Sequence, residues 1–158
     1  MNQLTKTLAL AAVVLAGAFG ATTAQASAAN FNVNFVVQNN DASVSMIRSG
    51  SLPSTVTGPI NPASAIAPGG SDPASGYATY SDQLPVLGFS KQVSLAYAKA
   101  SDGTQQCTFT IKVTHDGNAQ PYLLHITSDS ARCSVPSSDI RTSDGQFTSQ
   151  TSLLGWSS

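Results

Sequence analysis

Residues 105–115 read QQCTFTIKVTH, and apolar residues alternate with polar ones along the whole stretch. The apolar members, at every second position from Cys107 to Val113, share one face of an extended chain, while the threonines and Lys112 share the other. A period of two is typical of a β-strand with one buried face. The stretch therefore predicts a strand against which its neighbours in the sequence can be aligned.

The preceding segment, Lys91–Lys99, alternates in the same way, and Asp102-Gly103 indicates a hairpin turn between the two segments. Facing residues of an antiparallel pair lie on the same side of the sheet. A two-residue loop would set apolar residues against polar ones, whereas a three-residue loop, 101–103, aligns them. We therefore predict a bulged turn that has Gly103 in the left-handed region and brings Tyr97 opposite Cys107.

The same parity test predicts a four-residue loop after His115, which pairs His115 with Gln120. A third strand, Pro121–Ser128, then turns its apolar side chains inward and ends near the level of Cys107. Cys133, only a few residues further, therefore comes within reach of Cys107.

Further segments with a period of two bring the prediction to six to eight short strands. The most regular of them is Phe31–Gln38, and the turn residues Asn39–Asp41 after it predict a hairpin with Ser43–Arg48. Glutamate, which favours helices, is absent from the chain. The pattern predicts an all-β fold, an antiparallel β-sandwich. The remaining strands are expected at Tyr77–Tyr80, Asp139–Arg141 and Phe147–Trp156.

A long segment, residues 50–76, holds five of the eight prolines of the chain and several glycines. Proline lacks a backbone donor, so this segment cannot form a continuous ladder or a helix. Long irregular loops are uncommon in compact domains and are often functional. Two interpretations stay open: a loop draped over one end of the sandwich, or a binding loop.

Residues 1–26 have the layout of a signal peptide: a polar start with one cation, an uncharged run from Leu8 to Phe19, and the small-x-small sequence Ala24-Gln25-Ala26. The uncharged run is too short to span a bilayer. We expect cleavage before Ser27, with an alternative site two residues later. Residues 27–158 then form a single domain, secreted or periplasmic, of a bacterial protein.

The chain holds two cysteines, Cys107 and Cys133. An even number in an exported chain predicts a disulfide. The bridge would close a loop of about 25 residues and stabilise the fold by roughly 3.5 kcal/mol through the entropy of the unfolded chain. A reactive or metal-binding thiol is not expected, because no Cys-x-x-Cys spacing occurs.

The residues that could carry chemistry do not form a catalytic set. The two histidines, His115 and His125, are kept apart by the predicted register. Asp102, Asp116 and Asp144 each precede a glycine and are interpreted as turn residues. No Gly-x-Ser-x-Gly motif occurs. We therefore expect no enzymatic activity, no metal and no cofactor, and a secreted hydrolase is the least favoured alternative.

The net negative charge expected for the mature part, residues 27–158, argues against polyanionic partners. It carries eight aspartates, and six cations remain once Lys6 is removed with the signal peptide. Nucleic-acid binding is not expected, because the cations form no basic stripe. A surface rich in hydroxyls and poor in charge suits a glycan, a membrane surface or a protein. The candidate ligand or lipid contacts are three aromatic residues: Tyr77, Tyr80 and Trp156.

The opening half has an Asn-rich first strand, a long loop, the sequence Ile66-Ala67-Pro68-Gly69-Gly70-Ser71 and a strand that starts at Gly76. In these features it resembles small bacterial aegerolysin-type β-sandwiches. That family binds membrane lipids, so the resemblance implies a membrane-active, lipid-binding protein or toxin as an alternative function. The single tryptophan departs from the tryptophan-rich pattern of the family.

Our leading expectation is an exported, non-enzymatic binding or interaction module. It would use residues 50–76 and the nearby aromatic residues to bind a partner outside the cell or in the periplasm.

Overall fold

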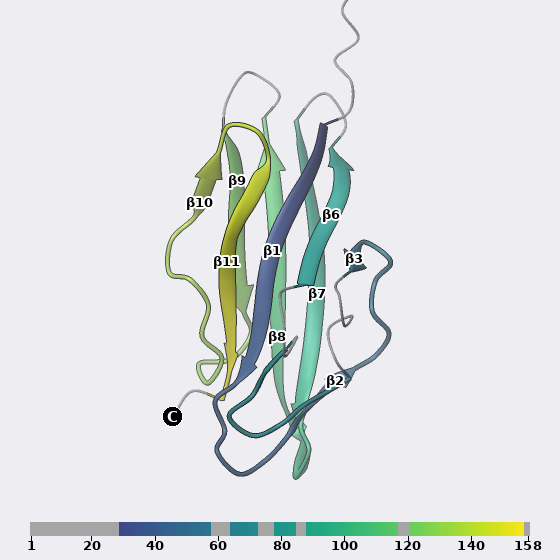
Figure 1. Cartoon of the computed structure of the whole chain (residues 1–158), viewed down its shortest axis with the longest axis vertical. Coiled ribbons are helices and arrows are strands. Elements are labelled where there is room, and N and C mark those ends of the chain that lie inside the picture. Colours follow the sequence, from purple (N-terminus) through teal and green to yellow (C-terminus); the bar gives the residue numbers. More distant parts are fainter. Residues whose placement is uncertain (1–28, 58–63, 73–77, 85–87, 117–120, 157–158) are drawn as a thin grey trace, which may run out of the picture.

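The computed structural model describes residues 29–57, 64–72, 78–84, 88–116 and 121–156. The expected signal peptide and Tyr77 lie outside these residues. The regular structure of the described part is β throughout and forms two sheets (Figure 1), which confirms the predicted all-β fold. The described residues contain no helix long and apolar enough to cross a membrane.

The front sheet of Figure 1 has five strands, with β1 in its interior. Its strands are β1 (Ala29–Asn39), β3 (Val56–Thr57), β5 (Ser71–Asp72), β6 (Ala78–Leu84) and β11 (Gln146–Gly155). They follow the order β11-β1-β6-β3, and β5 also pairs with β1. β1 is antiparallel to β6 but parallel to β11. The fold is therefore mostly antiparallel, and the prediction of a wholly antiparallel sandwich is corrected at this one pair.

The back sheet has six strands in the order β10-β9-β8-β7-β2-β4. Its strands are β2 (Met46–Ser49), β4 (Ala65–Ile66), β7 (Phe89–Lys99), β8 (Asp102–His115), β9 (Tyr122–Ser128) and β10 (Ile140–Thr142). The three long strands β7, β8 and β9 match the segments predicted from the alternation. Three two-residue strands raise the total in the described residues to eleven, above the expected six to eight.

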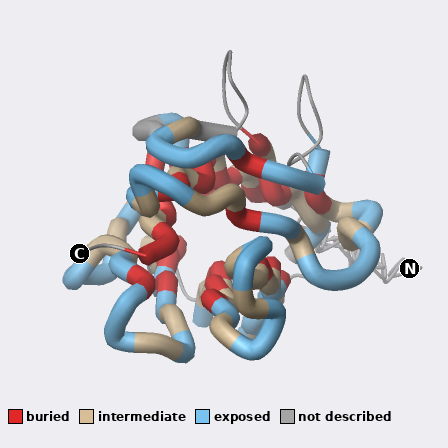
Figure 2. Tube along the Cα trace, turned by 90° about the horizontal axis from the view of Figure 1, so that it is seen from below, coloured by how far each residue is buried: buried red, intermediate tan, exposed pale blue. Residues whose placement is uncertain are grey.

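The core lies between the two sheets. On β1 the alternation predicted from the sequence is confirmed, because Phe31, Val33, Phe35 and Val37 are each at most 1% exposed. The apolar faces of β7, β8 and β9 meet them from the back sheet as one buried cluster. Figure 2, which looks along the strands, shows buried residues gathered towards the inside and exposed residues outside.

The register between β7 and β8 is the predicted one, with Tyr97 opposite Cys107, but the turn that connects these strands is different. Lys99 pairs with Asp102, and an irregularity in the ladder follows, so the extra residues lie inside β8 rather than in the loop. Gly103 does not have a positive φ. The predicted left-handed turn at Gly103 is therefore wrong. The side chains of β7 and β8 still lie on their predicted faces of the sheet, because the register of the two strands is the predicted one.

The register between β8 and β9 differs from the prediction by two residues. Val113 lies opposite Leu124 and Ile111 opposite Ile126, so the connection after His115 is longer than four residues. A shift of two leaves every side chain on its predicted face. The inward side chains of β9 are accordingly buried as expected.

The hairpin predicted between Phe31–Gln38 and Ser43–Arg48 does not form. After β1 the chain crosses to the other layer, where Met46–Ser49 pairs with β7 and β4. The turn chemistry of residues 39–41 is present, since Asp41 Oδ1 accepts the backbone N–H groups of Ser43 and Val44, each at 2.9 Å. These bonds reverse the chain between sheets rather than within one sheet.

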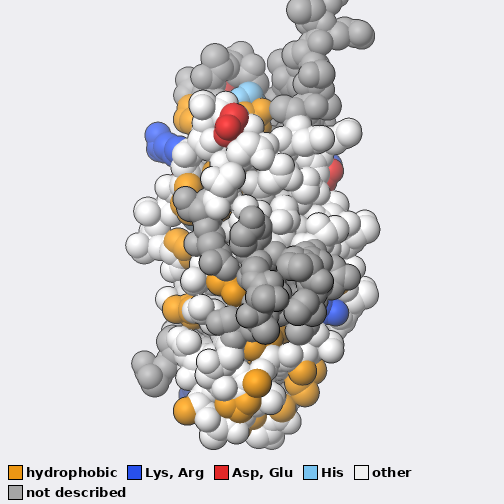
Figure 3. Space-filling model, in the orientation of Figure 1, with side chains coloured by type: hydrophobic (Ala, Val, Ile, Leu, Met, Phe, Trp, Pro, Cys, Tyr) orange, Lys and Arg blue, Asp and Glu red, His pale blue; other side chains and the backbone are white. Residues whose placement is uncertain are grey.

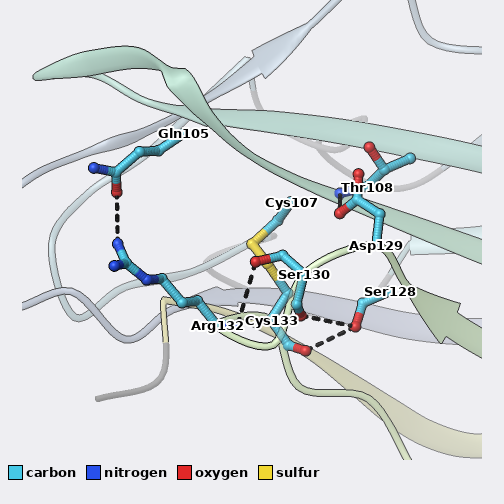
Figure 4. Close-up of a disulfide and its surroundings, with 8 residues drawn as sticks. All are labelled: Gln105, Cys107, Thr108, Ser128, Asp129, Ser130, Arg132 and Cys133. Carbon is cyan, nitrogen blue, oxygen red and sulfur yellow. Dashed lines mark hydrogen bonds between the residues drawn. A yellow bond between two sulfur atoms is a disulfide. The ribbon is translucent and has the colours of Figure 1, made fainter.

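The predicted disulfide between Cys107 and Cys133 is present. It joins β8 to the segment that follows β9, as Figure 4 shows. Ser128 Oγ donates to the carbonyl oxygen of Cys133 at 2.7 Å, and Thr108 N–H donates to Asp129 Oδ1 at 2.7 Å. The bridge and these hydrogen bonds fix the path of the chain beyond β9.

Candidate functional site

Of the three predicted aromatic contacts, Tyr77 lies outside the described residues and Tyr80 is packed in the core. Tyr80 is 1% exposed, and its ring meets Phe31 edge-on with ring centroids 5.0 Å apart. Burial, together with the Asp82 carboxylate, raises the pKa of Tyr80 to about 12. In the described structure Tyr80 therefore contributes packing and offers almost no ring surface to a ligand.

Trp156 directly follows β11 and is 7% exposed. It borders a shallow hollow together with Gln105 and Arg132, whose side chains are hydrogen-bonded at 3.1 Å (Figure 4 shows this pair). Tyr80 pairs with Val33, six residues before the end of β1, whereas β11 ends opposite Asn39. At about 3.3 Å per residue this separates Tyr80 from Trp156 by roughly 20 Å along the sheet. The structure does not bring the two aromatic residues together.

The described parts of the segment 50–76 are held on the sandwich rather than projecting from it. They form β3, β4 and β5, which pair with β6, β2 and β1. Asn39, only 1% exposed, donates its side-chain amide to carbonyl oxygens of Val44, Ile66 and Ala67. The absence of one continuous ladder is as predicted, and for the described residues the draped-loop interpretation is the better one.

The aspartates interpreted as turn residues include two whose turn role is confirmed. Asp102 Oδ1 accepts the backbone N–H of Thr104 at 3.0 Å and the Thr104 hydroxyl at 2.6 Å, and these bonds lower the pKa of Asp102. Asp144 accepts the hydroxyl of Thr142 and the backbone N–H of Gln146, which lowers the pKa of Asp144. Both carboxylates are thereby engaged in local turns.

The two histidines occupy different surroundings. The His115 ring stacks on Tyr122 with centroids 4.2 Å apart. His125 points outward opposite Lys112, and its Nδ1 lies 2.6 Å from Asp139 Oδ1. No group of three or more potential metal ligands occurs among the described residues.

The contact between His125 and Asp139 was not predicted, because the sequence did not show that the strand after Asp139 pairs with the strand that carries His125. A carboxylate at Nδ1 can orient an imidazole for acid-base chemistry, but this also needs a nucleophile at the other ring nitrogen. Within the part of the chain that the structure describes, His125 has no second hydrogen-bond partner. Both side chains are also largely exposed, at 56% and 43%. His125 and Asp139 therefore form an exposed ion pair when His125 is protonated, and the described residues around them do not complete a catalytic site.

The outer face of the front sheet carries amides and hydroxyls. Asn32 Nδ2 donates to Gln146 Oε1 at 2.7 Å, and Thr79 Oγ1 donates to Asn34 Oδ1 at 3.0 Å, so neighbouring strands are linked side chain to side chain. In Figure 3, which looks onto this sheet, most of the visible surface is white, and red or blue side chains appear only near its upper end and at its left and right edges. These amides and hydroxyls bond one another across neighbouring strands.

A hollow of about 560 Å³ lies on the back sheet, at the end where β7 begins and β8 ends. We call it the end cup. Its floor is a row of outward-facing residues, one from each of four neighbouring strands: Ser90 of β7, Thr114 of β8, Leu123 of β9 and Arg141 of β10. Its rim is formed by Phe89, His115, Asp116 and Pro121.

The register places the floor residues side by side. Ser90 lies opposite Thr114, Thr114 opposite Leu123, and Leu123 opposite Arg141. With about 4.8 Å between neighbouring strands, the row spans roughly 14 Å. The end cup therefore presents two hydroxyls, one apolar side chain and one guanidinium in a fixed order.

One sequence feature could have indicated the end cup. Tyr122, Leu123 and Leu124 are three consecutive apolar residues in a strand that otherwise alternates, so one of them has to face solvent. That residue is Leu123, which lies in the floor. The other floor residues carry no such signal, because Ser, Thr and Arg are ordinary on an outer strand face.

The comparisons with known proteins add no relative: no family model, no curated protein and no solved structure matches this chain.

Proposed function

We propose that this chain is an exported, non-enzymatic binding module and that the end cup is where it takes up its ligand. The observation that carries the proposal is the end cup itself, a hollow of about 560 Å³ built on four hydrogen-bonded strands. Small-molecule sites typically have about 300–1,000 Å³ and combine an apolar lining with a few placed polar groups. Leu123 with Pro121 supplies the first property, and Arg141 with the two hydroxyls supplies the second.

Export is supported by the disulfide between Cys107 and Cys133, because such bridges persist in oxidising compartments. This is consistent with a secreted or periplasmic location and with the expected signal peptide at residues 1–26. Glycans, membrane surfaces and proteins are the partner classes that such a location offers.

The end cup is a better candidate than the segment 50–76 or the aromatic residues. The described residues of that segment pair with the sheets as β3, β4 and β5, and Asn39 holds Ile66 and Ala67. Tyr80 and Trp156 are at most 7% exposed. Membrane insertion by exposed aromatics likewise has little support, since Ile47 is the one large hydrophobic residue that is exposed among the described residues.

The proposal is tested by an NMR titration of the oxidised protein, residues 27–158, against saccharides, organic acids, short peptides and lipid vesicles. We expect backbone shifts that centre on the end cup with at least one class of small molecule. Leu123→Trp fills the floor and should abolish the shifts. Thr127→Trp, also outward on β9 but beyond the cup, is the matched control and should retain them.

Shifts confined to the front sheet or to the segment 50–76 would place the binding site elsewhere. No shift with any probe, or turnover of a probe instead of binding, would overturn the proposal as a whole.

A further inference from the structure

We infer that the end cup takes a compact organic anion that carries hydroxyl groups, of the chemical class of acidic sugars. This inference rests on the proposed function and specifies its ligand. It follows from the order of the floor residues, which places a cation at one end, an apolar side chain beside it and two hydroxyls at the other end.

The cation is Arg141, which is exposed on β10. The ion pairs of the described residues involve Lys91, Lys99 and His125, so Arg141 has no carboxylate partner among them. A guanidinium presents paired N–H donors that match a carboxylate in bidentate geometry. Arg141 is therefore placed to receive the anionic group of a ligand.

The apolar part of the floor is Leu123, with Pro121 at the rim, both half-buried. Leu123 lies between Arg141 on one side and Thr114 on the other. A ligand held at Arg141 therefore passes over Leu123 before it reaches another polar group. The C–H face of a sugar ring suits this contact. A fully polar ligand would bind less tightly, because its polar groups would lose water over Leu123 without gaining a hydrogen bond.

The hydroxyl end is the facing pair Ser90 and Thr114. A second pair of the same residue types on the same two strands, Ser94 and Thr110, is engaged with itself at 3.0 Å. Ser90 and Thr114 have no such bond and no other side-chain partner in the described part of the chain. Their hydroxyls are thus available to a ligand hydroxyl, which distinguishes a hydroxylated acid from a fatty or aromatic acid.

Asp116 orients the ligand. It is exposed on the rim directly after β8, which lies two strands away from β10 in the sheet. Its carboxylate disfavours an anion at that side of the end cup, so the anionic group is directed to β10. The charge arrangement therefore fits a ligand with a single carboxylate at one end and disfavours a polyanion.

The experiment measures binding of glucuronate and galacturonate to the oxidised protein by NMR, with glucose and cyclohexanecarboxylate as the matched neutral and non-hydroxylated probes. Arg141→Gln should weaken uronate binding about tenfold or more, since hydrogen bonds to charged groups contribute about 1.5–3 kcal/mol. Arg132→Gln, which changes a cation outside the end cup, is the control and should leave binding unchanged. Thr114→Val should weaken uronate binding more than cyclohexanecarboxylate binding, with Thr127→Val as its control.

The outcomes separate the ligand class from the proposed function. If glucose binds the end cup as well as the uronates do, or if Arg141→Gln leaves uronate affinity unchanged, the inferred ligand class is wrong while the end cup remains a binding site. If a peptide or a vesicle, and no uronate, shifts the floor residues, the ligand class is likewise wrong. If no probe shifts the end cup, the proposed function and the inference fail together.

Discussion

Asn39 donates its side-chain amide to the carbonyl oxygen of Ile66 at 3.3 Å, across 27 residues of sequence. The same Nδ2 atom lies 2.8 Å from the carbonyl oxygen of Val44 and 3.2 Å from that of Ala67. Because Asn39 is only 1% exposed, one buried amide holds the end of β1, the crossing to the back sheet and the segment around β4 together.

We expect Asn39→Ala to lower the free energy of unfolding by about 2–3 kcal/mol, because it removes three hydrogen bonds of a buried amide, each worth about 0.5–1.5 kcal/mol. Urea denaturation at neutral pH measures the change. Asn34→Ala, at an outward position of the same strand, is the control and should cost less than about 1 kcal/mol. Equal losses for the two variants would show that Asn39 does not hold the segment.

Gly145 and Gly103 form a second matched pair. Gly145 has a φ of 75°, and a Cβ atom there would lie 3.3 Å from Phe31 Cβ. Gly145→Ala should lower the free energy of unfolding by about 1–2 kcal/mol through backbone strain. Gly103 has open space and no positive φ, so Gly103→Ala should stay within about 0.5 kcal/mol of the wild type. A large loss at Gly103 would instead support the left-handed turn predicted from the sequence.

The disulfide makes a stability contribution that can be removed cleanly. The cysteines are 26 residues apart, so Cys107→Ala combined with Cys133→Ala should lower the free energy of unfolding by about 3.5 kcal/mol. Cys107 is 0% and Cys133 5% exposed, so dithiothreitol should reduce the bridge slowly without denaturant and quickly with it. Thiol labelling measures both rates, and fast reduction of the folded protein would contradict the enclosed position.

Asp41 should make stability fall in acid. The Lys99 ammonium, 2.5 Å from Asp41 Oδ2, and then the backbone N–H of Ser43 hold the pKa of Asp41 below its ordinary value of 3.8. A carboxyl whose pKa is depressed by folding contributes its full stabilisation above the pKa of the unfolded chain. That stabilisation is lost as the pH falls below about 4 towards the folded-state pKa.

Urea midpoints between pH 5 and pH 2 measure the effect. Asp41→Asn should flatten the decline, and high salt should weaken the contribution because the pair lies near the surface. Asp116→Asn removes an equal charge elsewhere and should leave the decline in place. An unchanged profile for Asp41→Asn would assign the acid sensitivity to other carboxyls.

The sequence allowed prediction of side-chain faces but not of all strand partners. Alternation predicts which face of the sheet a side chain lies on, but a register shift of two residues leaves that face unchanged. Ile126 is therefore buried as predicted, although it lies opposite Ile111 rather than Phe109. Alternation also assigned residues 43–48 to the nearest strand, because a crossing between layers has the same local pattern as a hairpin. The difference is made by the buried amide of Asn39, whose partners are set by folding.

Apart from the exposed position of Leu123, the end cup could not be predicted, for a similar reason. Its floor depends on the order of β7, β8, β9 and β10 in the sheet and on their register. Both depend on how separate segments pair, so the sequence of one segment does not determine them. In the sequence alone Arg141 has the features of an ordinary surface cation. Its place in the end cup follows only from the pairing of β10 with β9, which sets Arg141 opposite Leu123. The aromatic residues were selected by type alone, and in the described structure burial, which depends on the whole fold, removes Tyr80 from the surface.

The parallel pairing of β1 with β11 also has a consequence for synthesis. Asn32 of β1 bonds to Gln146, which follows it by 114 positions, so one flank of an interior strand is supplied by a segment that is made much later. The nascent chain therefore carries β1, with Phe31 and Phe35, as a strand with an open edge until β11 has been made. Such non-local closure is slow and invites association between unfinished chains. A chain stopped before residue 146 should aggregate rather than persist as a smaller folded unit.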